Sequence, residues 1–297
     1  MSVSSTSPAL PIKLGCPVWN CEGWSDIVFP AGTKRTQWLS WYTQMFNCVE
    51  GNSSFYAIPT VEQARRWTSE AAKGFRFCLK FPREISHDRS LVNADSPTAQ
   101  FLLAIEELAS GDRLGPTFLQ MGPQFAADRF DVLKSYLMQL PREFPWAVEV
   151  RHKSWFDAGN NESRLNDLLS SLNIDKVIFD SRPLNQSPPE DEFEKQSQTR
   201  KPKTPIHKTA TGKHPLLRFI GRNRVEVVDS YIAQWLPTLV QWISEGRTPY
   251  VFTHTPDDTF APELARRFWE QLRAALPGNH DPLPILPRKP RQLEFLL

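Results

Sequence analysis

Short apolar runs alternate with longer amphipathic segments along most of this chain. In the longer segments, apolar residues recur at i, i+3, i+4 and i+7, which is the spacing of a helix with one buried face. The runs predict strands at 12–15, 48–52, 75–80, 116–120, 146–150, 176–180, 215–220 and 250–254. The amphipathic segments predict helices at 33–46, 60–71, 96–109, 129–140, 161–172, 230–244 and 262–276.

The order of these elements predicts an α/β fold. Seven of the eight expected strands precede an expected helix, and strand starts are about 30–40 residues apart. Eight such units build a TIM-type (β/α)8 barrel of about 250 residues. An open doubly wound sheet is the alternative, but it normally has a Gly-rich phosphate loop after its first strand. The segment LGCPVWNCEG lacks that loop, so a single TIM-type (β/α)8 barrel is the expectation.

Three stretches do not follow the barrel pattern. Residues 1–11 are expected to be an N-terminal extension, 12–276 the barrel, and 277–297 a Pro-rich C-terminal tail. Residues 182–214, between the sixth and seventh expected strands, show no clear apolar period. We expect them to form a long, basic, Pro-containing insertion that is irregular or partly ordered on the surface.

Charge is ordinary overall but uneven along the chain. The 297 residues include 35 Lys and Arg against 33 Asp and Glu, a formal net charge of +2. This balance gives no global attraction to nucleic acid or to anionic lipid. Residues 182–214 hold seven Lys/Arg and four Asp/Glu, so they carry +3 and the rest of the chain carries −1. A polyanion partner is therefore expected only at this segment.

The apolar runs and the cysteines indicate a compartment. No run of about 18 apolar residues exists, so we expect no membrane span. The first residues, MSVSSTSPALP, lack the basic and apolar regions of a secretory signal. Cys16, Cys21, Cys48 and Cys78 match no common zinc or iron–sulfur spacing. Reduced thiols in a cytoplasmic protein are the expectation, and the oligomeric state is left open.

Polar side chains gather at the carboxyl ends of the expected strands, where barrel enzymes place their chemistry. Because side chains alternate along a strand, Glu50 and Asn52 share one face, as do Glu149 and Arg151. The polar residues at this rim are Glu50, Asn52, Lys80, Gln120, Glu149, Arg151, Asp180, Arg182, Arg218 and His254.

This rim allows two interpretations. The charges can form a mutually satisfied ion-pair network that only closes the top of the barrel. Alternatively, they form a pocket for an anionic or polyhydroxylated ligand. We favour the pocket because clustered charges away from water cost free energy unless they are paired, and a purely structural barrel has no reason to gather so many of them. His254 is either a general acid–base or a structural histidine. Lys80 is expected to pair with a carboxylate, with phosphate binding or Schiff-base formation as alternatives.

Other chemistries have weaker support. Three carboxylates and a histidine can hold a divalent metal, but no ligand spacing supports one and four nearby cations oppose it. We therefore predict no metal and no cofactor. Trp19 and Tyr56, in loops after the first two strands, either stack on a sugar or base or simply pack the loops. No nucleophile elbow and no Walker loop occur in the sequence.

Several motifs, in order, resemble one known family. They are LGCPVWN, FNCVEGNSSFYAIP, FRFCLKFPREISH, VEVRHKSWF, FDSRPL, PLLRFIG and YVFTHTPDDTFAPELA. Together they resemble the YecE-like family, domain of unknown function 72, over residues 12–276. The resemblance implies a TIM-type barrel without an established activity. It places pocket candidates at Glu50, Asn52, Tyr56, Lys80, Glu149, Arg151, Asp180 and His254. Arg182, Arg218 and the basic 194–214 stretch resemble one branch of that family.

The leading hypothesis is an enzyme acting on a small anionic, phosphate-like or sugar-like molecule. Glu149 or Glu50 would then act as general base or acid, and Asp180 and His254 complete the expected catalytic set. Lys80, Arg151 and Arg218 would bind anionic groups. A second hypothesis is nucleic-acid binding or processing through the barrel mouth and the basic loop at 200–214, because TRKPKTPIHKTATGKH holds five Lys/Arg and no acid. A third is a ligand sensor that turns nothing over.

Overall fold

The computed structural model describes residues 10–284 of the chain. The rest of the expected N-terminal extension (1–9) and of the Pro-rich tail (285–297) lies outside the described residues. Every expected strand is present, and each strand end lies within one residue of its expected position. The strands are β1 (Lys13–Gly15), β2 (Cys48–Gly51), β3 (Arg76–Leu79), β4 (Thr117–Gln120), β5 (Trp146–Glu149), β6 (Asp175–Asp180), β7 (Leu216–Ile220) and β8 (Tyr250–His254).

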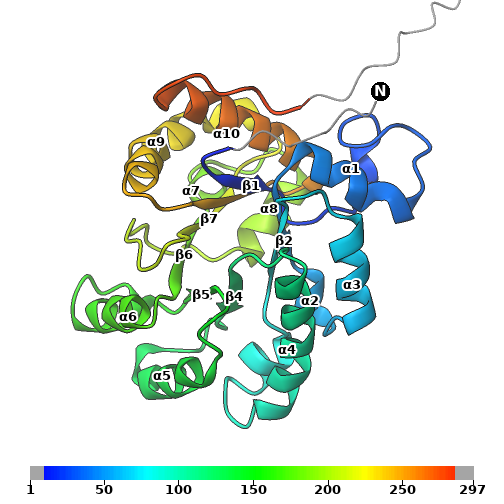
Figure 1. Ribbon diagram of the computed structural model, residues 1–297. Coiled ribbons are helices and arrows are strands. Elements are labelled where there is room, and N and C mark those ends of the chain that lie inside the picture. The colour runs from blue at the N-terminus through cyan, green and yellow to red at the C-terminus, as the bar shows by residue number, and fades with distance from the viewer. Residues whose placement is uncertain (1–9, 285–297) are drawn as a thin grey trace, which may run out of the picture.

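Helices surround these strands (Figure 1). All seven expected helices are present, but the first begins at Trp38 because Arg35–Gln37 forms a tighter 3₁₀ turn. Three more helices, α2, α7 and α8, follow β2 and β6. The helices are α1 (Trp38–Met45), α2 (Ser53–Tyr56), α3 (Val61–Glu70), α4 (Asp95–Ser110), α5 (Phe130–Gln139), α6 (Asn160–Ser171), α7 (Arg182–Asn185), α8 (Glu192–Arg200), α9 (Asp229–Ser244) and α10 (Ala261–Ala275).

The fold is α/β, and its main sheet is parallel and curled into a half-barrel. Six of them pair in the order β1-β8-β7-β6-β5-β4, whereas β2 pairs with β3 alone. The hydrogen-bonded pairing expected through all eight strands is therefore interrupted between β1 and β2 and between β3 and β4. Beside β1, the Tyr42 hydroxyl accepts from Cys16 N at 2.7 Å and donates to Cys48 O at 3.0 Å. The Asn47 amide likewise binds the backbone of residues 12 and 14, so side chains replace part of the ladder there.

Backbone contacts connect the two sheets at both ends. Glu50 N donates to Cys16 O at 3.1 Å, and Phe81 N donates to Phe118 O at 3.0 Å. A Cβ on Gly15 would lie 2.1 Å from Cys48 O, so only glycine lets β1 approach β2 this closely. Both sheets contribute to one buried apolar cluster: Cys48, Cys78, Phe118, Ala147, Val177, Leu216, Tyr250 and Phe252.

Residues 182–214 are more ordered than the apolar pattern predicted. Two helices, α7 and α8, lie within it, so the partly ordered alternative fits the segment and a wholly irregular path does not. Polar contacts hold α8: buried Glu194 pairs with Arg222 at 2.6 Å, and Gln198 Nε2 donates to Leu184 O at 2.6 Å. Phe193, the one large apolar residue of α8, is 56% exposed. A helix docked by polar groups has no apolar stripe, so hydrophobic periodicity could not reveal it.

Candidate functional site

A cavity of about 540 Å³ opens at the carboxyl ends of the strands. This size lies within the range of small-molecule sites, roughly 300–1,000 Å³. The sequence-predicted residues that line it are Asn52, Tyr56, Lys80, Gln120, Arg151, Arg218 and His254. Glu50 and Glu149 are buried and bind the guanidinium group of Arg218. The strand ends thus bring most of the predicted rim together.

Arg218, on β7, is the centre of an ion-pair network. Its Nε and Nη2 donate to both oxygens of Glu50, at 2.8 and 2.7 Å. Its Nη1 donates to Glu149 Oε2 at 2.7 Å. Arg151 Nε binds the other Glu149 oxygen at 2.6 Å, and Arg151 Nη2 binds Gln120 Oε1 at 2.6 Å. We call these five residues the Arg218 cluster.

The pKa values of the cluster's carboxyls follow from this pairing. Burial alone would raise the pKa of Glu149, but Arg151 and Arg218 outweigh it and lower that pKa to about 2. Burial also opposes ionisation of Glu50, yet Arg218 and His254 hold its pKa well below the usual range. Both groups are therefore carboxylates at neutral pH, and every oxygen already has a donor.

His254, at the end of β8, extends the cluster. Its Nε2 lies 3.1 Å from Glu50 Oε2. Burial, reinforced by Arg218 and Lys201, lowers the pKa of the imidazole to about 4 although Glu50 opposes the shift. The ring is thus neutral at pH 7, and since Glu50 is a carboxylate, Nε2 carries the proton and donates to it. Asn52 Nδ2 donates to the other Glu50 oxygen at 2.7 Å.

Lys80 differs from its expected role. The expected ion pair with a carboxylate is absent among residues 10–284, where both nearby glutamates pair with arginine instead. The Lys80 side chain is buried, and its Nζ lies 3.7 Å from the centroid of the Phe55 ring. Burial and the neighbouring Arg218 lower the pKa of this amine to about 7.

The other lining residues were not predicted from the sequence, among them three charged ones, Arg200, Lys201 and Asp258. Ser197, Arg200 and Lys201 come from α8 and its end, and Asp258 follows β8. Burial, then Arg218, lowers the pKa of Lys201 to about 8. Burial raises the pKa of Asp258 to about 6. Arg200 and Lys201 belong to the basic run TRKPK, but nothing in the sequence showed that the run turns toward the strand ends.

Asp180 and Arg182 do not line this cavity. Arg182 Nη2 binds Asp180 Oδ2 at 2.7 Å, and its Nε binds Oδ1 at 2.9 Å. Trp235 Nε1 of α9 donates to Asp180 Oδ2 at 2.8 Å. We call Asp180, Arg182 and Trp235 the Asp180 cluster. The ion pair and the indole hydrogen bond connect β6 to α9 away from the cavity, and the catalytic role expected for Asp180 stays a prediction.

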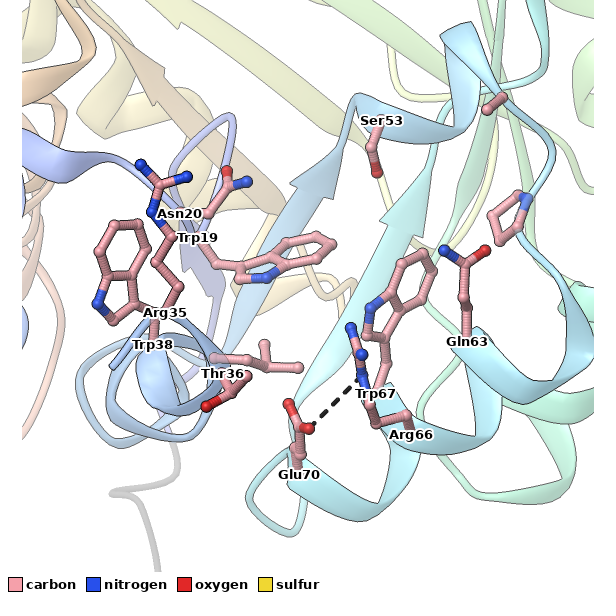
Figure 2. Close-up of a pocket in the computed structure, with 13 residues that line it drawn as sticks. Trp19, Asn20, Arg35, Thr36, Trp38, Ser53, Gln63, Arg66, Trp67 and Glu70 are labelled. Atoms are coloured by element: carbon pink, nitrogen blue, oxygen red, sulfur yellow. Dashed lines mark ion pairs between the residues drawn. The ribbon is translucent and has the colours of Figure 1, made fainter. Parts of the chain in front are cut away.

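Trp19 also lies elsewhere, in a second pocket of about 330 Å³ (Figure 2). Its ring meets Trp67 edge to face, with centroids 5.4 Å apart. Arg66 and Glu70 form an ion pair at 3.6 Å on the neighbouring α3, as Figure 2 shows. Ser53 of α2 lines this pocket, whereas Tyr56 of the same helix lines the main cavity. The short α2 therefore contributes to both the second pocket and the main cavity.

Within residues 10–284, no group of three or more His, Cys, Asp or Glu side chains is placed to hold a metal ion. Glu50 and Glu149 already have a guanidinium partner in Arg218. No helix of this range is long and apolar enough to cross a membrane. The four cysteines are unpaired by disulfides, and three of them are buried.

Comparison with known proteins gives a consistent family but no activity. A family model described as "Protein of unknown function DUF72" matches residues 13–288. The chain is 37% identical to the UPF0759 protein YecE of Escherichia coli K12 over 278 residues, covering 94% of this chain and 98% of YecE. It is 27% identical to the UPF0759 protein YunF of Bacillus subtilis over 143 residues, 45% of this chain and 50% of YunF.

Two solved structures share the fold. A DUF72 family protein from Thermotoga maritima superposes with a TM-score of 0.66 at 22% identity, covering 88% of this chain and 98% of that one. Another, from Enterococcus faecalis, gives a TM-score of 0.65 at 20% identity, covering 88% and 97%. At these identities the likeness shows the fold alone.

Proposed function

This chain belongs to the DUF72 family of YecE-like proteins, and on that premise we propose that it is an enzyme for a small anionic substrate. The substrate carries a carboxylate or a phosphate and occupies the cavity at the strand ends. The single observation behind this proposal is the charge of the cavity wall. Of the described residues that line it, Asp258 alone is acidic, whereas the cations are Lys80, Arg151, Arg200, Lys201 and Arg218.

A closed (β/α)8 barrel is part of the proposal. The backbone hydrogen bonds from Glu50 to Cys16 and from Phe81 to Phe118 join the two sheets on both sides. The shared apolar cluster also takes residues from β2 through β8. Closure would place all the strand ends around one mouth, which is where barrel enzymes bind substrate.

The positive surplus at the cavity supports anion binding. Glu50 and Glu149 both bind the guanidinium of Arg218. Within the described residues, Lys80, Arg200 and Lys201 have no carboxylate partner. Arginine can grip a carboxylate or phosphate through two parallel hydrogen bonds. An anion entering here would neutralise like charges that the protein has placed close together, which makes binding favourable.

The carboxylates of the Arg218 cluster are better suited to positioning than to proton transfer. A group with a pKa of about 2, like Glu149, is a weak base at neutral pH. We therefore assign Glu50 and Glu149 to orienting Arg218 and Arg151, which is a different role from the acid–base one expected from sequence. Groups that titrate near neutrality, such as Asp258 with its pKa of about 6, suit proton transfer better.

Anion titration tests this function. Inorganic phosphate and pyruvate, added separately, should raise the melting temperature of the protein, and Arg151→Gln should weaken binding about tenfold, or about 1.4 kcal/mol. Arg142→Gln is the matched control, because Arg142 is exposed and lies outside the cavity. Equal binding by Arg151→Gln and wild type, or no binding by either anion, would overturn the proposal. Turnover of the ligand that binds best then separates an enzyme from a sensor.

A nucleic acid is the alternative partner, as the basic run 200–214 suggested. Several of its charges are engaged within the protein. Lys208 donates to Gln234 O and lies 4.6 Å from the Trp235 ring, and His207 pairs with Glu162 at 2.7 Å. Lys203 and Lys213 remain exposed. Salt-sensitive binding of a labelled single strand that the double variant Lys203→Gln, Lys213→Gln abolishes would favour this alternative.

A further inference from the structure

Lys80 occupies an unusual place for a lysine. It follows β3, its side chain is 8% exposed, and it lines the cavity. Its Nζ lies over the face of Phe55, 3.7 Å from the ring centroid, and donates no hydrogen bond within residues 10–284. A lysine that only serves structure normally pairs when it is buried. Lys80 instead presents an unpaired amine to the cavity.

The surroundings of Lys80 favour the unprotonated amine. Burial is the main cause of its lowered pKa, and the guanidinium groups of Arg218 and Arg151 add to it. Glu149 and Glu50 oppose the shift, but both are already paired with arginine. With a pKa of about 7, roughly half of the Lys80 side chains carry a free amine at neutral pH, about 10³-fold more than for an ordinary lysine.

We propose that Lys80 is the nucleophile of this cavity and forms an imine with a carbonyl compound that also bears a carboxylate or phosphate. This inference rests on the proposed anion site, since the other cations that line the cavity, Arg151, Arg200 and Lys201, would hold the anionic group. Desolvation and a cationic neighbour are the two known ways of activating a lysine for this chemistry, and Lys80 has both. Phe55 beneath the amine restricts it to attack from the cavity side.

The step balances without an oxidant or reductant. The nitrogen lone pair of Lys80 bonds to the carbonyl carbon while the C=O π electrons move to oxygen. A proton passes from nitrogen to that oxygen and gives a carbinolamine. The hydroxyl takes up one further proton and leaves as water, and the nitrogen lone pair closes the C=N bond of a protonated imine. Asp258, which lines the same cavity, is suited to deliver that proton.

Reductive trapping tests the inference. The full chain is incubated with glyoxylate or with dihydroxyacetone phosphate and sodium cyanoborohydride, which delivers hydride to the imine carbon and leaves a stable secondary amine. Peptide mass mapping should locate the first adduct on Lys80, at least about tenfold faster than on exposed Lys134. The rate should reach half its maximum near pH 7. Lys80→Arg should remove this adduct, whereas Lys134→Arg should not.

Three results overturn the inference. They are adducts spread evenly over exposed lysines, a first adduct on Lys201, or a Lys80 rate that still climbs up to pH 10. A parallel titration with sulfate, which forms no imine, reports on the anion site alone. If sulfate stabilises wild type but Lys80 never reacts, the imine fails and the proposed function stands. If sulfate, phosphate and pyruvate all fail to bind, the proposed function fails.

Discussion

The Arg218 cluster and the Asp180 cluster are two ion-pair groups at the carboxyl ends of the strands, and they differ in charge balance. In the Asp180 cluster, one carboxylate meets one guanidinium and an indole N–H. In the Arg218 cluster, two carboxylates face two guanidinium groups, with Lys80 and Lys201 nearby and without carboxylate partners in the described chain. The first group lies away from the cavity, whereas the second adjoins it and has positive charge left over.

This difference separates two uses of the same residue types. The carboxylate of the Asp180 cluster already has its partners and links β6 to α9. The surplus of positive charge beside the Arg218 cluster is unfavourable in the free protein, and a bound anion reduces this repulsion. The comparison therefore predicts that changes in the two clusters will have different consequences for stability and for anion binding.

The largest effect is expected from Arg218→Met. Removing this guanidinium leaves Glu50 and Glu149 buried without their main partner, which should cost about 3–5 kcal/mol of unfolding free energy in a denaturant titration. If the variant does not fold, adding Glu50→Gln and Glu149→Gln should restore folding, because no buried carboxylate is then left without a guanidinium partner. A loss below about 1 kcal/mol would show that the cluster is not electrostatically coupled.

Asp180→Asn should cost less, about 1–3 kcal/mol, because Arg182 is part-exposed and can turn to water. Stabilisation by added sulfate should match wild type, since Asp180 does not line the cavity. Arg142→Gln again serves as the control. Weaker sulfate binding in Asp180→Asn would contradict the separation of the two clusters.

Anion affinity should fall as pH rises. Lys80 and Lys201 have pKa values lowered to about 7 and about 8, so they are charged below these values and neutral above them. Between pH 6 and 9 the cavity loses up to two positive charges, and sulfate affinity should drop about tenfold by calorimetry. Lys80→Met should flatten this profile, whereas Asp180→Asn should leave it intact. A profile that is flat in wild type would refute the assignment.

The smallest effect is expected from Arg200→Gln. Arg200 is exposed on α8 but lines the cavity, so sulfate affinity should weaken only two- to five-fold, in keeping with about 0.2–1 kcal/mol for an exposed charge. Lys195→Gln removes the same charge from the same helix, away from the cavity. Equal affinities in these two variants would show that the 182–214 segment does not contribute to the site.

Much of the fold could be predicted from the chain. The ends of every strand were predicted to within one residue. A buried parallel strand needs a continuous apolar stretch, and a turn or a helical pattern marks where that stretch ends. The pairs Glu50–Asn52 and Glu149–Arg151 were expected on common faces, and both are hydrogen-bonded. α8 was missed because its binding to the protein depends on Glu194, Gln198 and other polar groups, which leave no periodic pattern.

The sequence by itself determined the eight strands, the seven main helices and the family, since these depend on local apolar periodicity and on motifs. Only the tertiary structure decided which rim charges share a cavity. It paired Asp180 with Arg182, placed Trp19 on the other side of α2, and brought Lys201 beside Arg218. It also left Lys80 buried and unpaired within the described residues, which a residue list cannot show. Charge balance depends on distances across the fold, and those exist only once the chain has folded.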